Sequence, residues 1–124
     1  MLLSARRWLA IAAANGFIGV AAGAFAAHAL KQSLSSDLLE VFKTGAQYQL
    51  IHALALGLAA LTPENKPIRL ARWLFLGGIV LFSGSLYALA LSGMHKLGII
   101  TPFGGVAFLA GWAMLAAGAL KRGE

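Results

Sequence analysis

Four long apolar stretches, separated by short segments that gather the charged residues, constrain this chain more than any other feature. The stretches cover about residues 8–30, 45–61, 71–93 and 102–120. A membrane-crossing helix needs ~20 mostly apolar residues, and all but the second stretch reach that length. Only 11% of the 124 residues are charged, whereas a soluble domain carries roughly a quarter, so too little polar surface remains for a globule in water. These features predict an integral membrane protein.

The patterning of the stretches indicates their secondary structure. None of them alternates apolar and polar residues with the period of two that a membrane β-barrel requires. No linker or change of composition divides the chain. We therefore expect an all-α integral membrane protein, a single four-transmembrane-helix bundle over residues 1–124.

Particular residues mark where the helices begin and end. Pro63 and Pro67 predict a reversal of the chain, because proline cannot continue a helix and restricts the residue before it. Asp37, with Glu40 three positions later, is typical of a helix N-terminus ahead of the second stretch. Thr101, directly before a proline, is predicted to cap the fourth helix.

The basic residues predict an orientation in the membrane. One set, formed by the two ends of the chain and the middle loop, contains Arg6, Arg7, Lys66, Arg69, Arg72, Lys121 and Arg122. The opposing set contains Lys31, Lys43 and Lys96. Lys and Arg concentrate on the cytoplasmic side of membrane proteins, so both termini are expected in the cytoplasm. We ascribe the net charge of +6 to this bias and expect no nucleic-acid partner.

The first stretch also has an alternative interpretation. Basic residues, an apolar run and small residues such as Ala24 and Ala26 resemble a secretory signal peptide. The run is about as long as a true span needs, however. We therefore expect it to be retained as the first transmembrane helix.

Small residues recur at spacings that suit close helix packing. Membrane helices associate through small residues and hydrogen bonds, because lipid gives apolar side chains no reason to prefer one another. The predicted packing residues are Asn15, Gly19, Gly23, Gly104, Gly111 and Gly118. The pair Gly19 and Gly23 has the spacing of a dimer motif, which leaves self-association as an alternative role.

A group of polar side chains inside the stretches is the leading candidate site. Polar groups are costly in hydrocarbon and normally face the bundle interior or a wet cavity. The proposed ligand-binding set is His28, Gln47, Tyr48, Gln49, His52, Ser83, Ser85 and Tyr87, which we place in the outer half of the bilayer. Helix rotation limits this set, because Gln47 points opposite to His52 and His28 need not meet His52. Hydrogen bonding between helices is the ordinary alternative for all of them.

Missing residue types exclude many chemistries. The chain has no cysteine, and its four carboxylates, Asp37, Glu40, Glu64 and Glu124, lie in loops or at the terminus. A metal or haem would require both intramembrane histidines to converge. A serine hydrolase would need Ser83 or Ser85 beside a histidine, and no aspartate in a span could orient that histidine. We expect neither a catalytic residue nor a metal nor a cofactor, and an enzyme is disfavoured.

Four segments together resemble a known family. They are GAFAAH at 23–28, TGAQYQLIH at 44–52, LFSGSLY at 81–87 and ITPFGG at 100–105. In this order and spacing they resemble the YgdD-like small inner-membrane proteins, a family of unknown function with a mitochondrial relative in animals. The resemblance implies four membrane helices in a bacterial inner membrane. It supports seven residues as the family's polar signature, namely His28, Gln47, Tyr48, His52, Ser83, Ser85 and Tyr87. Ala26 stands where the family leads us to expect glycine.

These observations favour a structural or accessory role. We expect a small inner-membrane protein that contacts the lipid bilayer and associates with itself or with a larger membrane complex. The alternative is a protein that binds or transports a small molecule or ion at the polar site around His52.

Overall fold

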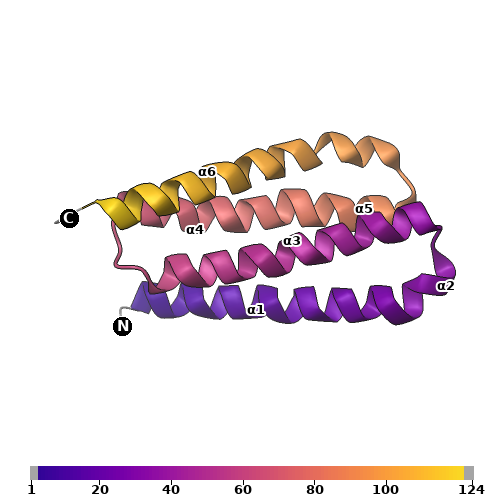
Figure 1. Ribbon diagram of the computed structural model, residues 1–124, viewed down its shortest axis with the longest axis horizontal. Coiled ribbons are helices and arrows are strands. Elements are labelled where there is room, and N and C mark those ends of the chain that lie inside the picture. The colour runs from indigo at the N-terminus through magenta and orange to yellow at the C-terminus, as the bar shows by residue number, and fades with distance from the viewer. Residues whose placement is uncertain (1–2, 122–124) are drawn as a thin grey trace.

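The computed structural model describes residues 3–121 as four long helices lying side by side (Figure 1). The first comprises α1 (Leu3–Phe25), the π-helical turn η1 (Ala26–Leu30) and the short α2 (Lys31–Ser33). The second is α3 (Ser36–Leu61). The third comprises α4 (Lys66–Gly78), the π-helical turn η2 (Ile79–Ser83) and α5 (Gly84–Ser92). The fourth comprises the 3₁₀ turn η3 (His95–Ile99) and α6 (Thr101–Leu120).

Three of these four helices are long and apolar enough to cross a membrane by themselves. They are Leu3–Ser33, Lys66–Ser92 and His95–Leu120. The remaining helix, α3, begins with charged residues and carries several polar side chains along its length. It packs against the first helix, through α1, and against the third helix, through α4 and α5.

The helix ends agree in part with the sequence prediction. The reversal between α3 and α4 falls between Leu61 and Lys66, as the two prolines predict. The N-cap of α3, however, is Ser35, whose Oγ accepts from the backbone N–H of Leu38 at 3.2 Å. The prediction of an N-terminus at Asp37 was therefore wrong by two residues, and this acidic residue lies in the first turn, where it suits the positive end of the helix.

Two further ends have clear physical causes. Gly93 ends α5 with φ of +74°, a left-handed conformation that glycine adopts without steric cost. Thr101 was expected to cap the fourth helix, but it is the first residue of α6 and makes no cap. Its hydroxyl lies 2.6 Å from that of Ser85 and so joins α6 to α5.

The core runs along the bundle in two apolar clusters. The larger contains Leu56 of α3, Phe75 of α4 and Phe108 of α6, all nearly inaccessible. The smaller surrounds Phe42 and Ala90. One end of the bundle contains the start of α1, the end of α6 and the loop between α3 and α4 (Figure 1). Arg122 and Glu124 lie outside the described residues.

Candidate functional site

The side-chain amide of Gln49 joins three helices. Its Nε2 donates to Oδ1 of Asn15 on α1 at 3.1 Å, and its Oε1 accepts from the hydroxyl of Tyr87 on α5 at 2.7 Å. Nδ2 of Asn15 donates in turn to the backbone carbonyl of Ile11 at 2.9 Å. Asn15, Gln49 and Tyr87 thus form one chain of hydrogen bonds, which we call the Gln49 bridge. It satisfies groups that would be costly to leave unpaired in an apolar interior.

His52 lies one turn further along α3 and faces α6. Its ring stacks on Phe108, with centroids 3.5 Å apart and an interplanar angle of 6°. Nδ1 lies 2.8 Å from the carbonyl oxygen of Tyr48, and Nε2 lies 3.1 Å from the indole nitrogen of Trp112. A carbonyl can only accept and an indole can only donate, so the ring carries its proton on Nδ1. Both ring nitrogens are therefore engaged within the protein.

The two serines of the predicted site also bond within the bundle. Ser83, which is fully buried at the end of η2, donates to the backbone carbonyl of Gly45 on α3 at 2.7 Å. The hydroxyl of Ser85 contacts that of Thr101 and donates to the carbonyl of Phe82 at 2.9 Å. Among the described residues, then, His52 is hydrogen-bonded to neither serine. The pair that a serine hydrolase needs is not formed there.

The structure brings together only part of the predicted polar set, and Ser85 bonds to Thr101 and Phe82 instead. Five members, Tyr48, Gln49, His52, Ser83 and Tyr87, meet on or beside α3. Gln47 is exposed, on the opposite side of the helix from His52, as its rotation predicts. His28 is exposed in η1, close to the end of its helix.

The two histidines lie at different depths. His52 is sixteen residues beyond the first residue of α3, or about 24 Å along the axis, whereas His28 lies within about two turns of the end of its helix at the same end of the bundle. The expectation of a shared depth was wrong. No group of three or more potential metal ligands occurs within residues 3–121.

Most of the predicted packing glycines lie in close contacts. A Cβ on Gly19 would fall 2.8 Å from Leu50, and one on Gly111 would fall 2.7 Å from Phe75. A Cβ on Gly104 would collide with the backbone nitrogen of Phe82, so α6 approaches the third helix there with backbone against backbone. A Cβ on Gly118 would fall 2.5 Å from Ile68. Gly23 differs, because no heavy atom of the described chain comes within 4 Å of its Cβ position.

A second polar cluster, at the end of the bundle where α1 begins, was not predicted from the sequence. Arg72 is 1% exposed; its Nη1 contacts Glu64 at 3.3 Å and its Nε donates to the carbonyl of Ala59 at 3.2 Å. The guanidinium thus covers the last carbonyls of α3, the negative end of that helix. Glu64 also accepts from Ser4 at 3.3 Å. We call Ser4, Glu64 and Arg72 the end cluster.

Asn65 connects the same end of the bundle to α6. Its Oδ1 caps α4 by accepting from the N–H of Ile68 at 3.1 Å, and its Nδ2 donates to the carbonyl of Gly118 at 3.0 Å. The sequence held the signal, because asparagine two residues before a proline is typical of a helix start. In the sequence, Arg72 counts only toward the predicted orientation in the membrane. Its position inside an apolar stretch could also have indicated a buried partner.

Comparisons with known proteins agree with this architecture. A family model described as "Protein of unknown function (DUF423)" matches residues 22–105, which is more than half of the chain. The chain belongs to the DUF423 family. The matched residues include the Gln49–Tyr87 contact and His52, and end before Trp112.

Several relatives match the DUF423 chain over nearly its full length. UPF0382 membrane protein YwdK of Bacillus subtilis is 41% identical over 118 residues, covering 92% of this chain and 96% of the relative. UPF0382 inner membrane protein YgdD of Escherichia coli is 43% identical over 126 aligned positions, covering 96% and 93%. A UPF0382 membrane protein of Haemophilus influenzae is 45% identical over 117 residues, covering 93% and 94%. No solved structure matches the chain.

These matches confirm the resemblance to the YgdD-like proteins. This DUF423 member is an all-helical, multi-pass protein of the inner or plasma membrane, so its exposed apolar side chains contact lipid. Neither the family description nor the relatives' names assign an activity.

Proposed function

We propose that this chain is a structural or accessory membrane protein, built to associate with itself or with a larger membrane complex. The observation that carries the proposal is the Gln49 bridge. Its polar groups bond to one another or to backbone within the bundle. Every buried side-chain nitrogen and oxygen of the described residues has a hydrogen-bond partner. Polar side chains used in this way fix the rotation and order of membrane helices.

The alternative, binding or transport of a small molecule or ion around His52, has less support. Two cavities, of about 560 and 530 Å³, are apolar grooves at the surface. Tyr87 lines the second groove, but neither Gln49 nor His52 lines either one. A transport site would be expected to present polar groups to a water-filled path.

The proposed topology has four spans with both termini in the cytoplasm. The span added to the three apolar helices would be α3, the second helix along the chain. Its charged first turns make it less apolar than the others. Two observations support its crossing. Its 26 residues extend about 39 Å, and residues 44–61 contain no Asp, Glu, Lys or Arg. It also packs along α1, which is apolar enough to cross by itself, as part of the helix Leu3–Ser33.

The state of the full chain in mild detergent tests the functional proposal. We expect native mass spectrometry to give a homo-oligomer or a defined complex, and His52→Ala to lower the free energy of unfolding. A monomer whose melting temperature rises saturably with an added small molecule, in the wild type but not in His52→Ala, would contradict the proposal and favour the binding alternative.

A further inference from the structure

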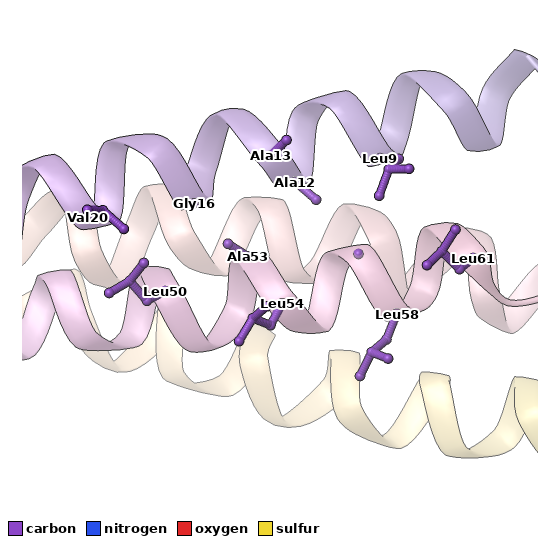
Figure 2. Close-up of a pocket in the computed structure, with 11 residues that line it drawn as sticks. Leu9, Ala12, Ala13, Gly16, Val20, Leu50, Ala53, Leu54, Leu58 and Leu61 are labelled. Carbon is purple, nitrogen blue, oxygen red and sulfur yellow. The ribbon is translucent and has the colours of Figure 1, made fainter.

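An apolar groove lies between α1 and α3 on the surface of the bundle. Figure 2 shows leucines of both helices along its sides, with small residues such as Ala13 and Gly16 between them. The groove has a volume of about 560 Å³. Apart from its two chain neighbours and the nearby backbone of its own helix, no described atom lies within 4 Å of a Cβ placed on Gly16, so no other part of the described chain fills the space beside it.

The groove covers one membrane leaflet rather than the whole bilayer. On α1 it extends from Leu9 to Val20, and on α3 from Leu50 to Leu61, which in each helix is about 17 Å. Half of the ~30 Å hydrocarbon core is about 15 Å. This length suits an acyl chain, which occupies one leaflet.

The end of the groove at Leu9 and Leu61 is next to polar and basic groups. Leu61 also lines a smaller cavity of about 180 Å³, which Glu64 and Arg72 of the end cluster border. Arg6 lies three residues before Leu9, on the same side of α1, and is exposed, as is Arg7. The carboxylate of Glu64 is already paired with Arg72, so the free charge at this end is positive.

We propose that this groove holds one acyl chain of an anionic phospholipid, whose phosphate lies against Arg6. A lipid tail gains no hydrophobic free energy when it moves from the surrounding lipid into the groove. The complex would be stabilised by close packing of the tail in the groove and by charge attraction between the headgroup and Arg6. The proposal concerns the leaflet at the N-terminal end of the bundle. It holds for either orientation of the protein in the membrane.

Two glycines on α1 give a matched test. Gly16→Leu would place a side chain in the groove, and Gly23→Leu would place the same side chain on the same helix outside it, also where the described chain leaves open space. Full-length protein in detergent is mixed with phosphatidylglycerol, and native mass spectrometry measures the bound fraction. We expect one lipid per chain in the wild type and in Gly23→Leu, and its loss in Gly16→Leu.

The charge is tested separately. Arg6→Ala should weaken phosphatidylglycerol binding about fivefold, the effect of one basic residue beside an anionic surface, and should leave phosphatidylcholine unchanged. Lys96→Ala, at the opposite end of the bundle, should change neither. Ala13→Leu is a second groove variant, and circular dichroism establishes that each variant is folded.

Three outcomes would overturn the proposal. Equal lipid retention by folded Gly16→Leu and Gly23→Leu would show that the groove is not the site. Equal binding of both lipids by the wild type would remove the role of the headgroup. Loss of a dimer in Gly16→Leu, without loss of lipid, would assign the groove to a second copy of the chain.

Discussion

The indole nitrogen of Trp112 lies 3.1 Å from Nε2 of His52, and this contact joins the last helix to the second. The two residues are sixty positions apart in sequence. Phe108, one turn before Trp112 on α6, stacks on the same imidazole. A single ring of α3 thereby contacts two successive turns of α6.

Removing the donor from this contact should destabilise the bundle. Trp112→Phe keeps an aromatic ring but leaves Nε2 of His52 without its partner, at a cost of roughly 0.6–1.7 kcal/mol, the range for hydrogen bonds between membrane helices. Unfolding in mixed micelles with rising SDS content measures the loss. Trp73→Phe is the control, because Trp73 is 65% exposed. Equal losses in both variants would contradict the role of the contact.

The two neighbouring glutamines give a second matched pair. Gln49→Leu removes both side-chain hydrogen bonds that Gln49 makes in the bridge. It should cost about 1–3 kcal/mol, because the hydroxyl of Tyr87 loses its acceptor and Oδ1 of Asn15 loses its donor. Gln47→Leu, on an exposed side of the same helix, should change stability little. The same unfolding assay applies. A larger effect at Gln47 would show that its side faces an unseen partner rather than lipid.

Adjacent glycines on α6 test the close approach of backbones. Gly104→Ala would force its methyl group against the backbone of Phe82 and should cost about 1–3 kcal/mol by overpacking. A Cβ on Gly105 would meet only the ring of Phe82, at 4.0 Å, so Gly105→Ala should be neutral or slightly stabilising. If the two variants unfold alike, the helices do not approach as described.

Arg72 provides a test at the end of the bundle. Arg72→Met leaves Glu64 without its cation and the carbonyl of Ala59 without its donor. We expect a loss near the lower end of the roughly 3–5 kcal/mol for breaking a buried pair, because the side chain of Glu64 is still 23% exposed. Arg69→Met removes an exposed charge from the same helix and should have little effect on unfolding. Two equally stable variants would refute the structural role of the pair.

The proposed orientation can be measured with single cysteines, because the chain has none of its own. Met94→Cys, between α5 and α6, should react with a membrane-impermeant maleimide in spheroplasts, which lack an outer membrane. Pro63→Cys, in the loop between α3 and α4, should react only after the cells are permeabilised. The reversed pattern would place both termini outside.

The sequence predicted the helices well and their mutual contacts only in part. The helix limits are marked by apolar runs, prolines and Gly93. Each of these signals affects only the residues around it, so it can be interpreted from the sequence alone. Rotation around one helix correctly separated Gln47 from His52. It could not identify Trp112 as the partner of His52, because that contact depends on which helices are neighbours.

The errors have a similar origin. Placing His28 at the depth of His52 assumed that the apolar stretches start at the same depth, whereas α3 begins nine residues ahead of the apolar run expected from residue 45 onward. Each of the π-helical turns η1 and η2 contains one residue more than a turn of an ideal α-helix. The extra residue changes the direction around the helix in which all later side chains point. His28 lies inside such a turn.

The polar character of α3 has a consequence for the biogenesis of the protein. Its side chains bond to α1, to the third helix and to α6, so no single neighbour can satisfy them. When α3 leaves the ribosome, only the first helix has been made, and Asn15 is the one described side chain outside α3 that is then present to bond to these groups. We therefore expect α3 to settle fully in the bilayer only after the later helices arrive, which makes insertion of this small protein a concerted event.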